Sequence, residues 1–300
     1  MERLWADAES AYRARILEAL PPPTSSMRLL DVGCDDGAWT ERLRSTLGVP
    51  ARDVHGLEII PTRAELALRR GFDVRVGDVD ERWPYEDESF DVVHANQVIE
   101  HVTRLDHFVQ ETKRMLRPRG LAIVCTENLA SWHNVFALGL GYQPFSLTNI
   151  SSQGPIGNPL ALHAGEPGPA ESWQHVHLLS LTALRELFVA HGFALDAFWG
   201  SGYHPFSGRL AARLAAIDPR HAHFIGVVAR ESRTDKLLTV AAALYVFLPF
   251  DVIPDFIPIV GHFDDAIVVA LVVSSVRHRW LSWLRRLVKK PRPLEARQVT

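Results

Sequence analysis

Short apolar runs alternate with amphipathic stretches over the first 126 residues of this 300-residue chain. Residues 2–20 have the spacing of an amphipathic helix, which the triple proline at 21–23 ends because proline lacks the amide donor that a helix needs. After it, buried strands are predicted at Arg28–Val32, Val54–Leu57, Asp73–Val76, Phe90–Ala95 and Leu121–Thr126, and helices between them at Thr40–Leu47, Thr62–Arg70 and Asp106–Leu116. This alternation predicts an α/β fold with a doubly wound, mostly parallel sheet that helices cover on both faces. Ligands of such sheets bind at the carboxyl ends of the strands.

The pattern loosens between residues 127 and 175, where Gly, Pro, Ser and Asn are frequent and aromatic residues are scattered among them. A segment of this length with aromatic side chains is more typical of a functional lid than of a linker. Regular periodicity resumes with a predicted helix at Thr182–His191 and strands at Phe193–Trp199 and His223–Ala229.

The last seventy residues differ in character. Two apolar stretches, Leu237–Phe250 and Ala266–Val276, flank a segment rich in Pro and Asp. The longer stretch would reach about 21 Å as a helix, short of a bilayer core of about 30 Å. We therefore expect a small C-terminal helical hairpin and two domains, residues 1–232 and 233–300. The acids Asp251, Asp255, Asp264 and Asp265 cluster near its tip. We expect Asp264 and Asp265 to lie at the N-terminus of the second helix, an interpretation preferred to a divalent-cation site.

The net charge of −3 conceals an asymmetry. Before residue 277 the chain has 24 basic and 34 acidic residues, a net charge of −10, and from residue 277 onward it has 8 basic and one acidic, a net charge of +7. Trp280 and Trp283 lie among these basic residues, a pattern typical of an anionic membrane surface rather than of nucleic acid. Basic residues on both sides of the hairpin predict the cytoplasmic side of a membrane, with a soluble cytoplasmic protein as the alternative. With only two cysteines, a disulfide-stapled secreted fold is excluded.

Candidate chemistry begins where the first predicted strand ends. The run from Asp31 to Gly37 reads DVGCDDG and leads into a helix, as in nucleotide-binding turns. A dinucleotide site would have glycine at the position of Asp35, and a second acid at Asp36 would further repel a pyrophosphate. A cationic cofactor without phosphate, S-adenosylmethionine (SAM), fits this turn better. The simpler alternative is a βα turn whose acids only cap the helix.

Acids follow the next two strands as well. Glu58 could accept both hydroxyls of a ribose, Asp78 could bind the adenine amino group, and Val79 could pack on the ring. Five segments then resemble, in order, the motifs of class I SAM-dependent methyltransferases, above all the small-molecule branch with the ubiquinone-biosynthesis O-methyltransferases: Leu29–Thr40, Glu58, Gly77-Asp78, Phe90–His101 and Leu116–Ile123. The resemblance implies a Rossmann-like methyltransferase fold over roughly residues 25–230 and the cofactor-binding residues Asp31, Gly33, Asp35, Gly37, Glu58, Asp78, Val79 and Asn96. This chain departs from the family at Asp35, which could cap an amide, contact the methionine ammonium or narrow the pocket.

The resemblance also places Glu100 and His101 at the mouth of the pocket. His101 is the candidate general base, since its unperturbed pKa lies near 6.5, and otherwise a capping or pocket-lining residue. Glu100 would orient or hold cofactor or substrate. Substrate contacts are predicted from Asn128, a polar residue just after the fifth strand, and from the hydrophobic wall and lid residues Trp132, Phe136, Tyr142, Trp173 and His175. No metal site is expected, because His175 and His177 lack a third ligand at convincing spacing.

The C-terminal part carries a second resemblance. Residues Tyr245–Asp265, YVFLPFDVIPDFIPIVGHFDD, are similar to the core of the YkvA-like domain of unknown function, a small helical family often regarded as membrane-associated. Together these patterns predict a SAM-dependent methyltransferase of a small hydrophobic or lipid-like acceptor near a membrane. The alternative is a non-catalytic SAM-binding or scaffold protein of a membrane complex. The oligomeric state stays open.

Overall fold

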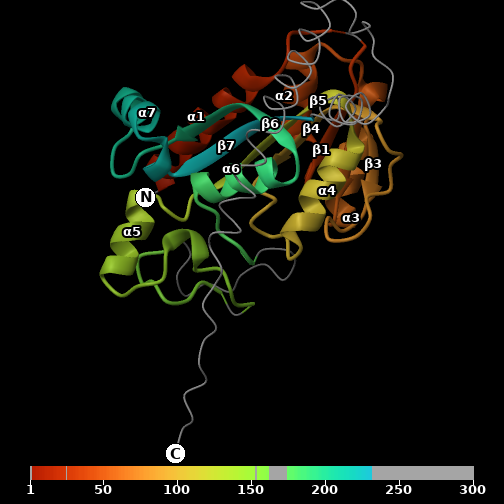
Figure 1. Ribbon diagram of the computed structural model, residues 1–300. Helices are drawn as coiled ribbons and strands as arrows, with labels where there is room; N and C mark the ends of the chain where they lie inside the picture. The colour runs from red at the N-terminus through yellow and green to blue at the C-terminus, as the bar shows by residue number, and fades with distance from the viewer. Residues whose placement is uncertain (1, 25, 153, 162–173, 232–300) are drawn as a thin grey trace, which may run out of the picture. The chain divides into compact units, whose positions relative to one another are not determined.

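The computed structural model describes residues 2–24, 26–152, 154–161 and 174–231 (Figure 1). The predicted C-terminal domain with its hairpin, Asp cluster and basic end lies outside the described residues, as does Trp173.

A seven-stranded sheet with the order β3-β2-β1-β4-β5-β7-β6 forms the centre of the described part. The strands β3, β2, β1, β4 and β5 run parallel, whereas β7 is antiparallel to both of its neighbours. This confirms the predicted mostly parallel, doubly wound sheet. The bounds are β1 Leu29–Val32, β2 Val54–Glu58, β3 Asp73–Val76, β4 Phe90–Asn96, β5 Leu116–Glu127, β6 Phe193–Ser201 and β7 Phe224–Glu231.

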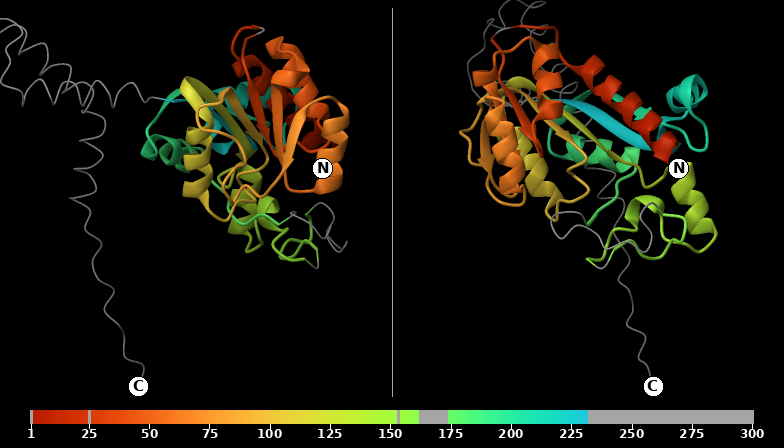
Figure 2. Two further views of the ribbon diagram at one scale, coloured as in Figure 1. Left: turned by 90° about the vertical axis from the view of Figure 1, so that its right-hand side faces the viewer. Right: turned by 180° about the vertical axis from the view of Figure 1, so that it is seen from behind.

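Helices cover both faces of the sheet (Figures 1 and 2). Successive side chains of a strand point to opposite faces, so Leu30 and Val32 join one apolar core and Leu29 joins the other. The first core includes side chains of α4 and α6, and the second includes side chains of α1, α2 and α3. The bounds are α1 Glu2–Ala19, α2 Ala38–Leu47, α3 Pro61–Arg69, α4 Leu105–Met115, α5 Trp132–Gly139, α6 Leu181–Ala190 and α7 Gly208–Ile217, with single 3-10 turns at Ala51–Asp53, Phe145–Leu147 and Pro219–His221.

Two of these helices were not expected from the sequence. Helix α5 lies within the predicted lid and carries apolar residues on all sides, so its sequence shows no helical period. Helix α7 follows β6, where no regular element is predicted. The predicted strand Leu121–Thr126 in turn begins earlier, at Leu116, with a shifted register near its start.

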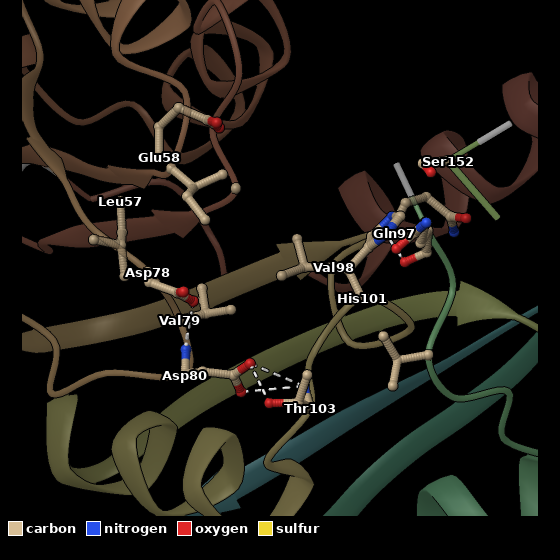
Figure 3. A pocket seen from close by; sticks show the side chains of 14 residues that line it. Leu57, Glu58, Asp78, Val79, Asp80, Gln97, Val98, His101, Thr103 and Ser152 are labelled. Atoms are coloured by element: carbon tan, nitrogen blue, oxygen red, sulfur yellow. Dashed lines mark hydrogen bonds between the residues drawn. The ribbon is translucent and has the colours of Figure 1, made fainter. Parts of the chain in front are cut away.

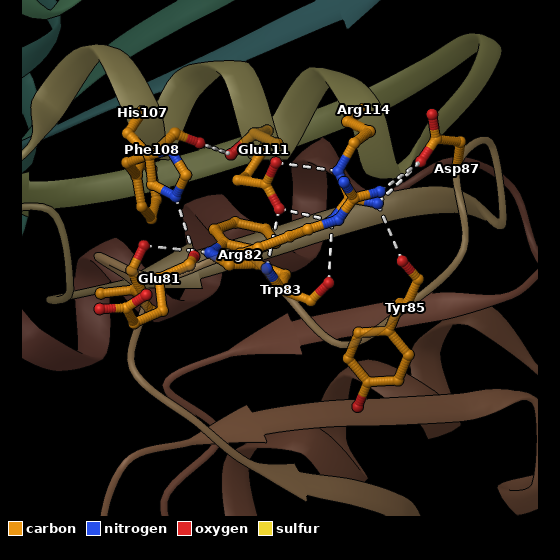
Figure 4. A network of polar contacts seen from close by, with 11 residues as sticks. Glu81, Arg82, Trp83, Tyr85, Asp87, His107, Phe108, Glu111 and Arg114 are labelled. Atoms are coloured by element: carbon orange, nitrogen blue, oxygen red, sulfur yellow. Dashed lines mark hydrogen bonds and ion pairs between the residues drawn. The ribbon is translucent and has the colours of Figure 1, made fainter.

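A network of polar contacts holds the loop between β3 and β4 against α4 (Figure 4). The Arg114 guanidinium donates to the Glu111 carboxylate and to the carbonyl oxygens of Trp83 and Tyr85. Glu111 also accepts from the backbone N–H of Trp83 at 2.8 Å. The side chains of Arg114 and Glu111 are only 14% and 9% exposed, so the buried Glu111 carboxylate depends on Arg114 for its charge balance.

Replacing Arg114 by methionine is expected to lower the free energy of unfolding by about 3–5 kcal/mol, because it leaves the Glu111 carboxylate buried without its partner. Denaturant unfolding followed by circular dichroism measures the change. Arg82→Met is the matched control: this side chain is 77% exposed and lies 3.8 Å from Asp87, so we expect a change within about 0.5 kcal/mol. Equal stabilities of the two variants would contradict the role of the network.

Candidate active site

Two cavities meet at the carboxyl ends of the central strands. The first, of about 500 Å³, is lined by residues that follow β2, β3 and β4, among them Glu58, Asp78 and His101. The second, of about 770 Å³, lies between α1 and α2 and includes Asp31 and Asn96. Gly33 lines both. A ligand that passes over Gly33 can therefore place one half in each cavity.

The turn after β1 brings the backbone close to this passage. Gly33 has a φ of +70°, and its N–H donates to the carbonyl oxygen of Leu57 at 2.7 Å. A Cβ at this position would lie 2.5 Å from Cγ2 of Val98, so only glycine fits. Gly37 has a φ of +76° and packs against Ala67 of α3, and it lines neither cavity. Of the two predicted glycines, Gly33 thus lies at the passage and Gly37 serves helix packing.

Asp35 occupies the position where the resembling family has glycine. Its φ is +49°, a left-handed conformation that Asp tolerates better than most side chains. Its N–H donates to Glu58 at 2.9 Å, and its carboxylate lies 3.2 Å from the Arg63 guanidinium. Asp35 lines the second cavity with its charge paired. The neighbouring Asp36 accepts from the N–H of Ala38, the first residue of α2, while the N-cap position itself is Gly37.

The first cavity has an acidic wall. Glu58 is buried and accepts from the N–H groups of Asp35 and Ile60, both at 2.9 Å. A carboxylate has about four lone-pair sites, so two remain for ribose hydroxyls. Asp78 and Val79 line the same cavity, and Figure 3 shows them beside Glu58 and across from Gln97 and His101. This arrangement suits a ribose and an adenine on the acidic side.

The second cavity holds an unsatisfied acceptor. Asn96 donates to the Tyr12 hydroxyl at 3.5 Å, but its buried Oδ1 has no hydrogen-bond partner within the described residues. An ammonium group, such as that of the methionine part of SAM, would supply the missing donor. Asp31 is buried beneath the same cavity and binds Thr40 at 2.5 Å and His94 at 2.7 Å, so both of its oxygens already have side-chain partners. The residues present therefore fit SAM across both cavities.

Glu100 and His101 differ in their access to the cavity. His101 lines it, and its Nδ1 donates to the carbonyl oxygen of Gln174 at 3.0 Å. Because a carbonyl only accepts, Nε2 of His101 is the unprotonated nitrogen. Burial and the nearby His175 lower the pKa of His101 to about 4, whereas burial raises the pKa of the Glu100 carboxyl to about 8. Glu100 lies behind the cavity wall and is 1% exposed.

Asn128, which is predicted to contact the substrate, lines neither of the two cavities. Asn128 is fully buried; its amide donates to the carbonyl oxygens of Arg220 and Ala222, and its Oδ1 accepts from the N–H of Ala130. Loop backbone thus takes up the hydrogen-bonding capacity of the Asn128 amide, and its contact with a substrate stays a prediction.

Of the predicted aromatic wall, Trp173 lies outside the described residues, and the described part does not line the two cavities. Trp132 donates to the Tyr203 hydroxyl at 2.7 Å and stacks on His221, and neither Trp132 nor Tyr142 lines either cavity. His175, in contrast, lies against His101, with 4.8 Å between the ring centroids.

Sequence reasoning also missed two residues of the first cavity. Gln97 has a φ of +56°, and its buried Nε2 has no partner within the part of the chain that the structure describes. Asp80 accepts from the hydroxyl and the backbone N–H of Thr103 (Figure 3). It also accepts from the backbone N–H of Arg104. Burial raises the pKa of Asp80, but these hydrogen bonds outweigh it and hold the pKa below its usual value. Its position two residues after Asp78, at the end of a strand, was the signal available in the sequence.

The model of the methyltransferase domain family matches residues 4–197. The chain belongs to this methyltransferase family. The match confirms the prediction of a SAM-dependent methyltransferase domain and of SAM as its cofactor. Residues 235–271 match a second family, described as a protein of unknown function (DUF1232), in agreement with the YkvA-like resemblance.

Among curated proteins, the mitochondrial ubiquinone biosynthesis O-methyltransferase of Rattus norvegicus is 26% identical over 195 residues, which cover 62% of this chain and 50% of the relative. A phthiotriol/phenolphthiotriol dimycocerosates methyltransferase of Mycobacterium ulcerans is 34% identical over 138 residues, 43% of this chain and 52% of the relative. The chain thus spans about half the length of the curated relatives that it matches.

Solved structures agree in fold. A chain in a complex between a methyltransferase activator and a methyltransferase from Haloferax volcanii has a TM-score of 0.51 at 15% identity, over 77% of this chain and 94% of that one. An S-adenosylmethionine-dependent methyltransferase from Listeria monocytogenes has a TM-score of 0.50 at 13% identity, over 74% of this chain and 97% of that one.

Within the described residues, no helix combines the length and apolar character that crossing a membrane requires.

Proposed function

We propose that this protein transfers the methyl group of SAM to a hydroxyl oxygen of a hydrophobic, lipid-like acceptor taken from a membrane surface. The observation that carries the proposal is the position of His101. Its ring lines the same cavity as Glu58 and Asp78, on the opposite side, with Nε2 unprotonated (Figure 3). A hydroxyl acceptor between them would have a proton acceptor on one side and the cofactor on the other.

The proposed reaction is a displacement at carbon. The acceptor oxygen forms a bond to the methyl carbon while the bond from that carbon to the sulfonium breaks, and its electron pair stays on sulfur as S-adenosylhomocysteine. The hydroxyl proton passes to His101. Alignment of oxygen, carbon and sulfur supplies much of the rate, which suits a cavity whose walls come from the ends of rigid strands.

Exposed apolar side chains support a lipid-like acceptor. On α5 and just after it, Phe136 is 63% exposed and Leu140 is 75% exposed, and Val135, Leu138 and Tyr142 are also exposed. A cluster of exposed apolar residues indicates an interaction site for a hydrophobic partner. The relatives named for ubiquinone biosynthesis and for phthiotriol dimycocerosates point to acceptors of the same kind.

The decisive experiment incubates the full chain with SAM carrying a labelled methyl group, together with either a lipid extract or an aqueous extract of cells. We expect label in the lipid fraction. Finding the labelled methyl group in an O-methyl ether would identify oxygen as the acceptor atom. Absence of SAM or S-adenosylhomocysteine binding in calorimetry would refute the proposal. SAM binding without methyl transfer to either extract would instead favour the non-catalytic scaffold alternative. The sequence feature that supports this alternative is Asp35, whose carboxylate forms an ion pair with Arg63.

A separate experiment tests whether the exposed apolar side chains of α5 contact a membrane. Replacing Phe136 and Leu140 together by serine should weaken binding of the full chain to anionic phospholipid vesicles by about 100-fold or more, since each side chain of this size contributes about 1.5–3 kcal/mol when fully buried. Vesicle co-sedimentation measures the affinity. Ile217→Ser is the matched control, because Ile217 is 81% exposed on a different helix, α7. If the double variant binds vesicles as tightly as the wild type, α5 is not the contact.

A further inference from the structure

Three metal-ligating side chains converge beside the first cavity. Glu100 and His101 follow β4, and His175 lies more than seventy positions later in the sequence. One ligand atom from each lies within 4.8 Å of the other two. The backbone holds them in place, since the N–H groups of Val176 and His177 donate to the carbonyl oxygen of Glu100 at 2.8 and 3.1 Å. The fold thus places Glu100 and His101 beside His175, whereas the sequence spacing offered only His177 as its partner.

Both imidazoles are in the tautomer that binds a metal. Nδ1 of His101 donates to the carbonyl oxygen of Gln174 at 3.0 Å, and Nδ1 of His175 donates to that of Ser146 at 2.6 Å. Each Nε2 therefore carries a free lone pair. A carbonyl or carboxylate that accepts from the second ring nitrogen is the usual partner of a metal-bound histidine.

The Glu100 side chain supplies an independent observation. It is 1% exposed, and its Oε2 accepts from the Thr126 hydroxyl at 2.8 Å. Its Oε1 is buried and has no hydrogen-bond partner among the described residues. A buried polar atom without a partner destabilises the fold, and a cation bound by Glu100 would remove that penalty.

We propose that Glu100, His101 and His175 bind one divalent transition-metal ion. Two imidazole nitrogens and one carboxylate oxygen suit Zn²⁺, Co²⁺ or Fe²⁺ better than Mg²⁺ or Ca²⁺, which prefer oxygen ligands. Three protein ligands leave coordination positions open. Because His101 also lines the first cavity, the ion lies at its wall, where it would favour loss of a proton from an acceptor hydroxyl. With the ion on Nε2, His101 would hold the ion instead of accepting the proton itself, so the site goes beyond the proposed function at this step, and ion binding itself does not depend on that function.

The test titrates the full chain, first stripped of metal with a chelator and dialysed, with Zn²⁺ in calorimetry and with Co²⁺ by visible absorption. We expect one ion per chain at this site. The His175→Asn variant keeps an amide donor for the Ser146 carbonyl but lacks Nε2, and Glu100→Gln keeps the shape of the side chain but cannot supply a carboxylate ligand. Each should bind at least ~100-fold more weakly. His177→Gln is the matched control, since the side chain of His177 contacts the carbonyl oxygen of Thr103, and it should bind like the wild type.

SAM titration of the same variants reports whether they are folded. A wild-type chain that takes up neither Zn²⁺ nor Co²⁺ would overturn the proposal. A His175→Asn variant that binds both ions as tightly as the wild type would also overturn it, because the ion would then lie elsewhere. The measurements contain no acceptor. A chain that binds the ion at these residues but transfers no methyl group would therefore refute the proposed function and leave the metal site standing.

Discussion

Replacing Gly33 by alanine is expected to weaken SAM binding by at least ~100-fold. A left-handed φ costs a non-glycine residue about 1–2 kcal/mol, which alone corresponds to roughly tenfold. The added Cβ would also lie 2.5 Å from Cγ2 of Val98, so the turn or Val98 must move. Since Gly33 lines both cavities, either movement changes the cavity wall at the residue that the two cavities share. Isothermal titration with SAM measures the loss.

The control for this variant separates backbone strain from position. Gly141 has a φ of +81°, and a Cβ there would meet nothing within 4 Å. Gly141→Ala therefore introduces similar backbone strain without a collision and at a residue that lines neither cavity. We expect it to bind SAM like the wild type. Equal affinities of the two variants would show that SAM does not pass over Gly33.

Local patterns predicted the sheet and the cofactor side of the site because their causes are local. A buried strand followed by a tight turn and an amphipathic helix can be recognised within a short stretch of sequence. The strand Asp73–Val76, for example, was predicted with its observed bounds. The carboxyl ends of parallel strands lie at one edge of a sheet, so the acids after β2 and β3 were expected together. Glu58 and Asp78 do line one cavity.

The acceptor side was harder to predict because its causes are tertiary. Asn128 follows a strand as a site residue would, yet loops more than ninety positions away in the sequence use its amide. His175 showed no third ligand, since Glu100 and His101 reach it only when the chain folds back. Helix α5 lacks a polar face, so the pattern that identifies an amphipathic helix could not reveal it.

Replacing His101 by asparagine is expected to lower kcat for methyl transfer by about 10²–10⁴-fold, the usual contribution of a positioned proton-transfer group. Asparagine can keep the donor to the Gln174 carbonyl in place of Nδ1, so the contact between the two loops survives while Nε2 is lost. SAM affinity should stay within about twofold of the wild type, because the residues that fit the cofactor, Glu58, Asp78 and Asn96, are unchanged. Single-turnover rates with the acceptor identified from the lipid extract, and calorimetry with SAM, measure the two quantities.

The matched control for His101→Asn is His177→Gln. His177 lies two residues from His175 and contacts the carbonyl oxygen of Thr103, but it lines neither cavity, so its loss should leave both kcat and SAM affinity near the wild-type values. A His101→Asn enzyme that turns over like the wild type would remove His101 from the reaction. A parallel loss of SAM affinity would instead assign His101 to cofactor binding. A fall in kcat alone shows that Nε2 of His101 acts on the acceptor, whether it takes the proton itself or binds the ion that makes the hydroxyl more acidic.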